Sequence, residues 1–556
     1  MSKKVIIVGG VAAGASTAAR LRRMDEQAEI IIFERGENIS FANCGLPYYI
    51  GNVIENRQDL LIQTPASMYT RFNIDVRNLS EVMAIDPQTK EVQVHNLSTG
   101  EKYRETYDYL VLCPGASPII PPIKGVNKAN VFTVRNIPDS DRIKAHVQQL
   151  HSQTENPRAI VVGAGYIGLE MADMLYHSGL EVSMVEAAPQ VMGAIDPDMA
   201  SIIHMHLSDQ GIKLYLSEKA LEFTGQDEVE QVVLESGKVL DTDLVILGTG
   251  VKPEVWLAEQ AGLKIGQNGG IEVDEYLRSS DPSIYAAGDA IETQHIVSKE
   301  KVLLPMASPA NRQGWIIANN IAGRPIPYSG VQGTGIVDVM GLAVAVTGLN
   351  ETALQSAGID YCVCHTHPFS HATYYPNSEQ MTFKLLFTPE EGKILGAQII
   401  GKDGVDKRID VIATAIRAGM TVFDLQELEL AYAPPFSSAK DPVNLTAYTA
   451  ANIVLHDVEV IRWEDVPAQV RAGAVILDVR MVQERNKMGA IPASINIPLD
   501  ELRQHLDQVP RDREILVHCA LGLRSYIACR ILMQNGFKVK NISGGYRMYR
   551  FLQHRS

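Results

Sequence analysis

The stretch that decides the fold runs Ala159-Ile-Val-Val-Gly163-Ala-Gly165-Tyr166-Ile167-Gly168, an apolar strand that enters a glycine-rich turn. A helix is expected from Leu169, and a second strand, Glu181 to Val185, ends on Glu186. In such a unit the glycines permit a tight turn and a close approach of the backbone to a pyrophosphate, which faces the helix N-terminus. The sequence therefore predicts a dinucleotide site that includes Gly163, Gly165, Tyr166, Ile167 and Gly168.

Glu186 indicates which nicotinamide cofactor binds there. Its carboxylate can accept a hydrogen bond from a ribose 2′-hydroxyl but repels a 2′-phosphate, and no arginine follows in the next few residues. We therefore expect NADH to be preferred over NADPH, with the strictness of that preference left open.

The same pattern occurs at the N-terminus, where an apolar run from Lys3 to Val8 enters the turn Gly9-Gly10-Val11-Ala12-Ala13-Gly14. We expect a helix from Ala15 to Met24 and a strand from Glu29 to Phe33 that ends on Glu34. Val11 stands where the second glycine of the motif belongs, so the turn alone is weak evidence. A later turn at Gly288-Asp289 can bind a ribityl chain and a pyrophosphate, and the two together predict FAD.

Composition limits the class of protein. A chain of 556 residues is too long for one core, since single cores stop growing near ~250–300 residues. A hydrophobic fraction of 46% with 43 glycines fits an ordinary α/β protein. A net charge of −15 argues against nucleic acid as a partner.

Membrane insertion, secretion and disulfides are not expected either. No run of ~18 apolar residues is present, and the apolar run after Lys3 and Lys4 is too short for a signal peptide. Six cysteines in so long a chain do not make a disulfide framework. We therefore expect a cytoplasmic protein with free thiols.

Cys44 lies in Ser40-Phe-Ala-Asn43-Cys44-Gly45-Leu46-Pro47-Tyr48-Tyr49, close enough to Glu34 to reach a flavin ring. No second cysteine follows, and the fifth position after it is Tyr49. Cys44 must therefore pair with something from outside, such as a small thiol, a sulfane sulfur or an oxygen-derived hydroxyl. A flavin or a helix N-terminus beside it would lower the thiol pKa from its free value of ~8.5.

A second cysteine motif, His518-Cys519-Ala-Leu-Gly522-Leu-Arg524-Ser525, follows a buried strand and precedes a helix expected over Tyr526 to Met533. It resembles the rhodanese active-site loop, Cys-x-x-Gly-x-Arg. Flanking matches to the rhodanese pattern are Asp478-Val-Arg480, Gly489-Ala-Ile-Pro-Ala-Ser and Gly544-Gly545-Tyr546, although Ala490 departs from the commoner histidine. Because Cys519 is retained, we expect an active sulfur carrier in which Arg524 braces the loop or the bound anion.

Over essentially its whole length the chain resembles the single-cysteine pyridine nucleotide-disulfide oxidoreductases with a fused rhodanese domain, namely coenzyme A-disulfide reductases and NADH-dependent persulfide or polysulfide reductases. The resemblance implies an α/β fold with two Rossmann-like dinucleotide-binding domains, an α+β dimerisation domain and a C-terminal rhodanese-like α/β domain. The expected limits are 1–119 with 250–325 for FAD, 120–249 for NAD, 326–455 for dimerisation and 456–556 for rhodanese.

The resemblance also implies site residues. The cofactor sites then comprise Gly9, Gly10, Ala13, Gly14, Glu34, Arg35, Val82, Pro114, Gly115, Gly163, Gly165, Tyr166, Ile167, Gly168, Glu186, Gly250, Gly288, Asp289, Pro305 and Ala307. Residues expected near coenzyme A (CoA) are Ser16, Arg20, Arg23, Ser40, Asn43, Arg71, Asn311 and Lys440; a solvated basic helix face is the alternative for Arg20 to Arg23. Tyr374 and Tyr432 resemble tyrosines that reach the cysteine of the partner in a homodimer, with Tyr375 a rival for Tyr374.

The cluster Cys362-Val-Cys364-His365-Thr-His367 invites a zinc interpretation. On a strand, however, the two cysteines face one side and the two histidines the other, so four ligands cannot converge without a bend. We expect no metal.

By resemblance, the chain is expected to reduce CoA persulfide or related persulfides and polysulfides with NADH through FAD and Cys44, while Cys519 handles sulfane sulfur. CoA disulfide is the alternative substrate. An NADH oxidase or peroxidase would use Cys44 as a sulfenic acid and leave the rhodanese segment without an evident purpose. A sulfur-carrier or sensory module with a regulatory flavin part also remains open.

Overall fold

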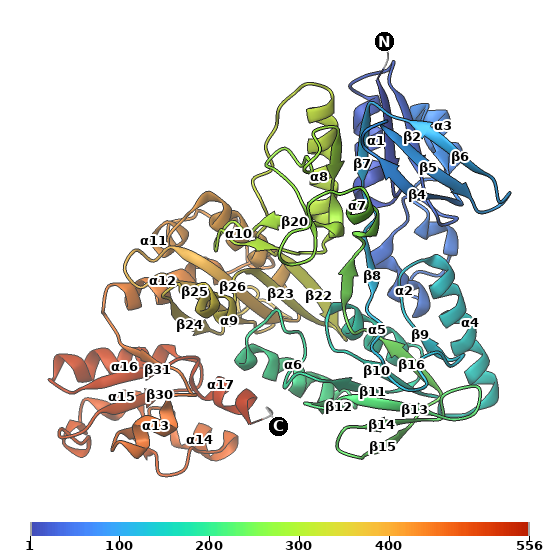
Figure 1. Cartoon of the computed structure of the whole chain (residues 1–556). Helices are drawn as coiled ribbons and strands as arrows, with labels where there is room; N and C mark the ends of the chain where they lie inside the picture. The colour runs from blue at the N-terminus through green and yellow to red at the C-terminus, as the bar shows by residue number, and fades with distance from the viewer. Residues whose placement is uncertain (1–2, 554–556) are drawn as a thin grey trace. The chain divides into compact units, whose positions relative to one another are not determined.

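The computed structural model describes residues 3–553 and divides the chain into two compact units. The first unit comprises the residues up to Ala187 together with Tyr215–Val331; the second comprises Ala188–Leu214 and the residues from Gln332 onward. Figure 1 shows the elements of both. The domain limits expected above remain predictions.

The first unit contains a parallel five-stranded sheet in the order β19-β7-β1-β2-β3. Its strands are β1 (Lys4–Val8), β2 (Glu29–Phe33), β3 (Asp75–Arg77), β7 (Tyr109–Leu112) and β19 (Ile284–Ala286). Helices α1 (Ala12–Arg22) and α8 (Ala307–Ile321) pack on each other. Helix α1 begins and ends earlier than the expected Ala15 to Met24, because the small residues after Val11 already belong to its first turn.

A second parallel sheet of this unit carries the other glycine turn. Four of its strands lie in the order β11-β10-β16-β9, namely β11 (Glu181–Glu186), β10 (Arg158–Val162), β16 (Leu244–Leu247) and β9 (Val131–Phe132). Helix α5 (Tyr166–His177) follows the turn after β10. A short antiparallel pair, β8 (Ala116–Pro118) and β17 (Val251–Pro253), follows the buried strands β7 and β16 along the chain.

The second unit contains an antiparallel sheet in the order β22-β23-β26-β25-β24. Its strands are β22 (Gly335–Val339), β23 (Leu342–Gly348), β24 (Cys362–Thr366), β25 (Thr382–Phe387) and β26 (Ile394–Gly401), and every residue of β25 and β26 is buried. Helices α10 (Val405–Ala418) and α12 (Pro442–Val454) pack against it. The alternation of the sequence predicts strands over 343–347, 361–366 and 381–387 and helices over 406–418 and 443–455, and each differs from the observed element by one residue at one or both ends.

The last part of the second unit is a parallel sheet in the order β27-β31-β30-β28-β29. Its strands are β27 (Val460–Ile461), β28 (Val475–Asp478), β29 (Ile495–Asn496), β30 (Ile515–His518) and β31 (Val539–Ile542). Helices α14 (Val482–Met488), α16 (Leu523–Gln534) and α17 (Gly545–Leu552) flank it. Helix α16 begins three residues before the expected Tyr526, because Gly522 at φ +120° already ends the loop.

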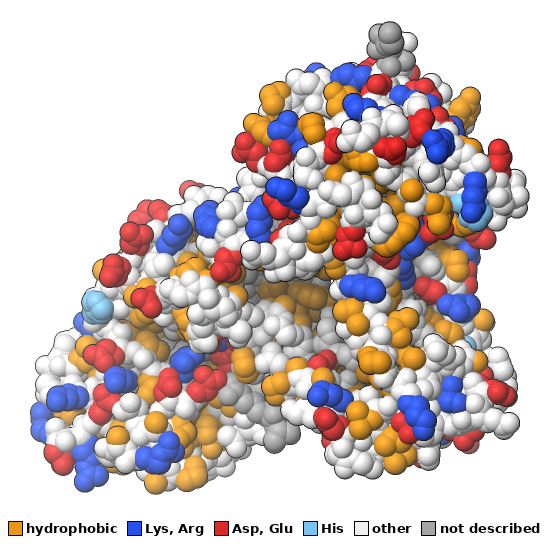
Figure 2. Space-filling model, in the orientation of Figure 1, with side chains coloured by type: hydrophobic (Ala, Val, Ile, Leu, Met, Phe, Trp, Pro, Cys, Tyr) orange, Lys and Arg blue, Asp and Glu red, His pale blue; other side chains and the backbone are white. Residues whose placement is uncertain are grey.

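Among residues 3–553, no helix has both the length and the apolarity that crossing a membrane would need. Figure 2 shows acidic and basic side chains interspersed over the visible face. That face presents no broad surface of one charge.

Candidate active site

A pocket of the first unit opens at the turn between β1 and α1. Its lining includes many residues expected to bind FAD, namely Gly9, Ala13, Glu34, Arg35, Val82, Pro114, Gly115, Gly288 and Asp289. The Glu34 carboxylate accepts hydrogen bonds from the backbone N–H of Gly10 at 2.9 Å and of Gly36 at 2.8 Å. Helix α8 enters the lining at Ala310, a turn after Pro305 and Ala307.

The backbone of this turn is shaped for a close ligand. Gly9 has φ +96°, and a Cβ there would lie 2.1 Å from the Cys113 carbonyl oxygen. A Cβ on Gly14 would lie 1.9 Å from the Gly9 oxygen. Only glycine fits both positions, so the turn stays tight although Val11 replaces the middle glycine. The pocket fits a dinucleotide such as FAD.

The second glycine turn follows the strict motif. A Cβ on Gly163 (φ +102°) would meet the Gly248 oxygen at 2.3 Å, and one on Gly168 would meet the Gly163 oxygen at 2.0 Å. A Cβ on Gly165 would meet open space, which is what a close pyrophosphate requires.

The surroundings of this turn also suit a dinucleotide. Glu186 accepts a hydrogen bond from the Ala164 N–H at 2.7 Å, and Tyr166 and Ile167 begin α5. Gly250 lies just after β16 with φ +95°.

Cys44 lies in a short 3-10 turn, Asn43–Gly45, beside the FAD pocket, whose lining includes Asn43. The thiol is exposed. Desolvation raises the Cys44 pKa, and the carboxylates of Glu170 and Asp289 raise it further. The lowering expected from a flavin or a helix N-terminus is not seen among the protein groups, because desolvation and then the two carboxylates act in the opposite direction on the Cys44 pKa.

Glu170 was missed from the sequence although it follows the glycine motif by two residues. Burial raises its pKa to about 7, and the Asp173 carboxylate adds to this. Burial also raises the pKa of Asp289. Cys44 thus has a neighbour that exchanges a proton near neutral pH.

Tyr49 occupies the position of the absent second cysteine. Its side chain is buried, and its hydroxyl donates to Asp141 at 3.2 Å. The Lys144 ammonium lies 3.8 Å from the ring centre. These contacts hold the Tyr49 ring in place. Cys44 therefore has no cysteine partner at this position.

Three of the residues expected near CoA come together on α1 and α8. The Ser16 hydroxyl donates to Asn311 Oδ1 at 2.5 Å, and the Arg20 guanidinium lies 5.2 Å from the Trp315 ring centre. Of the others, Arg23 caps α1, Ser40 has φ +43°, Arg71 lies on α3 (Pro65–Phe72), and Lys440 in the second unit lies over the Tyr448 ring.

The second unit brings Tyr374 and Tyr432 together. Their hydroxyls are 2.7 Å apart, and the side chains are 74% and 47% exposed. This bond raises the pKa of Tyr374. Tyr375, its rival, instead packs edge-on against His371, with ring centres 5.7 Å apart.

Cys519 is buried at the end of β30. Its sulfur accepts a hydrogen bond from the Gly522 N–H at 3.1 Å and one from the Ser525 hydroxyl at 3.5 Å. Arg524 forms a two-point ion pair with Glu484 of α14, at 2.8 and 2.6 Å. The loop thus forms a cradle of N–H and O–H donors that would suit a thiolate or persulfide, and Arg524 ties the loop to α14.

Buried ionic groups lie beneath this loop. Arg480 and Asp478 are fully buried and pair at 2.7 Å, and Arg480 also donates to the Gly489 carbonyl. His518 Nε2 lies 3.6 Å from Asp478, yet burial lowers the His518 pKa to about 4. His518 is therefore neutral at pH 7.

Histidines of β24 and its end connect the antiparallel sheet to the rhodanese-like loop. His365 Nδ1 and the Ser543 hydroxyl are 2.9 Å apart, and His367 Nε2 donates to the Gly544 carbonyl at 2.9 Å. The Tyr546 N–H in turn donates to the Cys519 carbonyl at 2.8 Å. The histidines of the zinc interpretation are thus engaged in hydrogen bonds with the protein.

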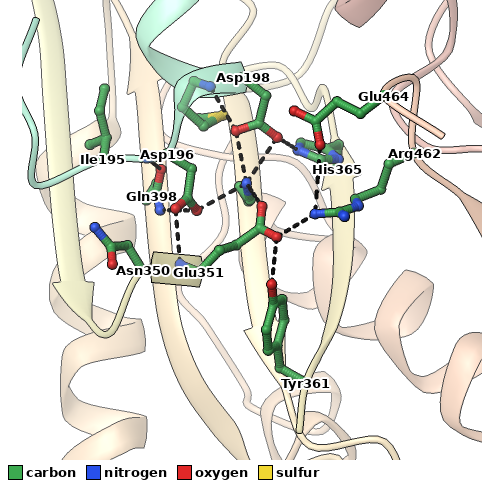
Figure 3. A network of polar contacts seen from close by, with 12 residues as sticks. Ile195, Asp196, Asp198, Asn350, Glu351, Tyr361, His365, Gln398, Arg462 and Glu464 are labelled. Carbon is green, nitrogen blue, oxygen red and sulfur yellow. Dashed lines mark hydrogen bonds and ion pairs between the residues drawn. The ribbon is translucent and has the colours of Figure 1, made fainter. Parts of the chain in front are cut away.

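Sequence reasoning missed a charged cluster in the second unit, shown in Figure 3. Lys384 Nζ lies 2.9 Å from Asp196, 2.8 Å from Asp198 and 2.5 Å from Glu351. His365 joins it through Asp198 at 2.7 Å. The three carboxylates come close enough for a cation, but the ammonium of Lys384 already bonds to all of them.

Comparisons with known proteins were made at the level of family, sequence and structure. Residues 3–314 match the family described as pyridine nucleotide-disulphide oxidoreductase, residues 336–442 match its dimerisation domain, and residues 463–550 match the rhodanese-like domain. The predicted family and fold class are thereby confirmed.

Two curated relatives are each 36% identical. A NADH oxidase of Methanocaldococcus jannaschii aligns with 80% of this chain and 98% of its own length. A coenzyme A disulfide reductase of Staphylococcus epidermidis aligns with 80% and 99%.

Two solved structures cover nearly the whole chain. Reduced CoADR-RHD from Bacillus anthracis has a TM-score of 0.97 and 49% identity, covering 100% of this chain and 99% of its own. A NAD-dependent persulfide reductase from A. fulgidus has a TM-score of 0.91 and 38% identity, covering 98% and 100%. The chain belongs to the pyridine nucleotide-disulphide oxidoreductases, a family of enzymes that use FAD and NAD(H).

Proposed function

We propose that this protein uses NADH and FAD to reduce CoA persulfide, or a related persulfide or polysulfide, at Cys44, and that Cys519 handles sulfane sulfur. The observation that carries the proposal is a single thiol beside a dinucleotide pocket, with Tyr49 where a second cysteine would stand. A cradled second thiol in the same chain supports sulfur as the cargo. The names of the similar proteins, a coenzyme A disulfide reductase and a persulfide reductase, agree with this.

In the proposed cycle the Cys44 thiolate attacks the outer sulfur of R–S–SH. The S–S bond breaks, R–S⁻ leaves and Cys44 becomes a persulfide. When bound, FAD supplies two electrons from NADH beside the thiol. Two electrons cleave the new S–S bond, which returns the Cys44 thiolate and releases HS⁻.

Proton supply is assigned to tyrosines across a homodimer. The matched dimerisation domain supports such a dimer, in which Tyr374 and Tyr432 of one subunit reach Cys44 of the other. Because the two hydroxyls are hydrogen-bonded and exposed, one can donate a proton to the leaving thiolate.

For CoA itself, we propose that the basic groups of α1 bind the phosphates. Arg20 and Arg23 follow Ser16 at helical spacing, and Asn311 of α8 already contacts Ser16. Arg71, Ser40, Asn43 and Lys440 complete the proposed set. We further propose that the protein acts in the cytoplasm and prefers NADH through Glu186.

Reoxidation of the NADH-reduced holoenzyme tests this function. Stopped-flow mixing with CoA persulfide, CoA disulfide, polysulfide and oxygen ranks the acceptors. Cys44→Ser should slow reoxidation by the preferred sulfur acceptor about a thousandfold, as loss of a nucleophile does. Cys362→Ser, a half-buried thiol of the second unit, is the matched control.

A NADH oxidase is the second candidate, because one relative carries that name. Oxygen would then reoxidise the enzyme faster than any sulfur compound, with Cys44 as a sulfenic acid. A Cys44→Ser enzyme that still reduced persulfide at the wild-type rate would exclude the Cys44 mechanism of persulfide reduction.

A further inference from the structure

The cation of the Cys519 loop is held in an ion pair with Glu484. Arg524 is the cation of the loop Cys519-Ala-Leu-Gly522-Leu-Arg524-Ser525, and its guanidinium donates through two nitrogens to the two oxygens of Glu484. We infer that Glu484 makes Cys519 selective for organic persulfides, R–S–SH, over the dianion thiosulfate. This inference rests on the proposed role of Cys519 as a sulfur acceptor.

Other cations of this region are also engaged. Arg480 is fully buried and paired with Asp478. Arg485 donates to the Ser494 carbonyl and lies 3.9 Å from Asp478. His518 is neutral at pH 7, because burial lowers its pKa to about 4. Arg524 is therefore the cation best placed to meet a donor at the thiol, and Glu484 neutralises it.

The two donors differ in the charge that they bring to the sulfur. With thiosulfate, Cys519–S⁻ takes the outer sulfur of S–SO₃²⁻, the S–S bond breaks, and Cys519–S–S⁻ and SO₃²⁻ result. Three negative charges must then converge on a cradle made of the Gly522 N–H, the Ser525 hydroxyl and the start of α16. With a protonated persulfide, R–S–SH, the products are Cys519–S–SH and R–S⁻, so the reacting sulfurs carry one negative charge throughout.

A dianion needs an unpaired cation where a persulfide needs only N–H donors. In the bidentate pair, Glu484 occupies the two N–H donors of Arg524 that a sulfonate would otherwise bind. The rim is also apolar, since Leu523 of α16 is 70% exposed and Val482 of α14 is 49% exposed. These apolar side chains suit a persulfide donor whose R group is uncharged next to the sulfur.

Loading of Cys519 by each donor tests the inference. The full-length FAD-bound protein is mixed with thiosulfate or with glutathione persulfide, and the gain of one sulfur on the peptide that contains Cys519 is followed by mass spectrometry. Wild type should load from glutathione persulfide at least about tenfold faster than from thiosulfate. Glu484→Gln should raise thiosulfate loading about fivefold, the upper end of the effect of one partly exposed ion pair, and change persulfide loading less than about twofold.

Glu501→Gln removes an exposed carboxylate from α15 (Leu499–Leu502) of the same segment and is the matched control. It should leave both rates unchanged. Salt gives a test that needs no variant, because added salt screens the repulsion of a dianion and should speed thiosulfate loading of wild type while hardly affecting persulfide loading.

The outcomes separate two levels of failure. If wild type prefers thiosulfate, if Glu484→Gln leaves the ratio of the two rates unchanged, or if salt slows thiosulfate loading, the inference about Glu484 is wrong while Cys519 remains a sulfur acceptor. If neither donor loads Cys519, the proposed sulfur-handling role fails as well.

Discussion

At the scale of single residues, Cys44 lies among carboxylates rather than cations. Glu170 and Asp289 both raise its pKa in addition to desolvation. This arrangement keeps the thiol protonated until a bound cofactor or substrate favours the thiolate. Glu170 itself exchanges a proton near neutral pH, because burial raises its pKa to about 7.

Replacing Glu170 by Gln should therefore lower the pKa of Cys44. Loss of one nearby carboxylate removes a repulsion that opposes the thiolate, and we expect a decrease of about half a pKa unit. The pH dependence of iodoacetamide alkylation at Cys44 measures it in the oxidised holoenzyme. Glu181→Gln, an exposed residue of β11, should not shift the profile, and a rise in the Glu170→Gln protein would contradict the assignment.

Glu186 should determine the choice of nicotinamide cofactor. Glu186→Gln removes the charge that repels a 2′-phosphate, so the preference for NADH over NADPH should fall about five- to tenfold. Steady-state kcat/KM values for the two cofactors give the ratio. An unchanged ratio would mean that another group selects the cofactor.

At the scale of elements, the antiparallel sheet is built around a buried lysine. Lys384 of β25 bonds to Asp196, Asp198 and Glu351, and Asp198 in turn bonds to His365. The nearby ammonium holds the pKa of Asp198 well below its usual range, although burial alone would raise it. The cluster is stable only as a whole, since each charge depends on the others.

Lys384→Met should destabilise the second unit by about 3–5 kcal/mol, the usual effect of removing one partner of a buried ion pair. Denaturant unfolding followed by circular dichroism measures the loss. Lys393→Met, at an exposed position next to β26, should change stability by less than about 0.5 kcal/mol. Equal effects of the two changes would show that the cluster contributes little.

Local patterns allowed the glycine turns, most strands and both cysteine loops to be predicted from the sequence. The repeated strand, turn and helix around Gly163 is a short-range signal, and it appears as expected. The Lys384 cluster joins residues 33 to 188 positions apart in the chain, and no local pattern reports such pairs. Tyr374 and Tyr432 were each predicted from the sequence, but the contact between them was not. The two positions are 58 residues apart, and only the folded chain brings them together.

At the scale of the whole molecule, buried neutral histidines link stability to pH. Burial lowers the His518 pKa to about 4 in the folded protein, against the ordinary histidine value of 6.5 that applies when the chain is unfolded. Below pH 6.5 the unfolded chain binds a proton that the folded chain does not, so stability falls as pH decreases from 6.5 to 4. Burial likewise lowers the pKa of His367, which acts in the same direction.

His518→Phe should therefore flatten the acid limb of the stability profile. Wild type should lose up to about 3 kcal/mol through this group between pH 6.5 and 4, and the variant should lose correspondingly less. Unfolding midpoints measured across this range give the comparison. His505→Gln, at the residue that precedes the short 3-10 helix Leu506–Gln508, serves as control, and an identical slope in the His518→Phe protein would refute the linkage.

The hydrogen bonds from His365 and His367 to Ser543 and Gly544 bear on how this chain can be dissected. The backbone that receives them also holds the Cys519 and Ala520 carbonyls, so the sulfur-carrying loop is supported from behind by a sheet that lies outside its own hundred residues. A fragment excised at residue 456 would leave that support behind. The C-terminal segment therefore depends on residues outside it. A fusion that moves this segment into another protein would have to include His365 and His367 as well.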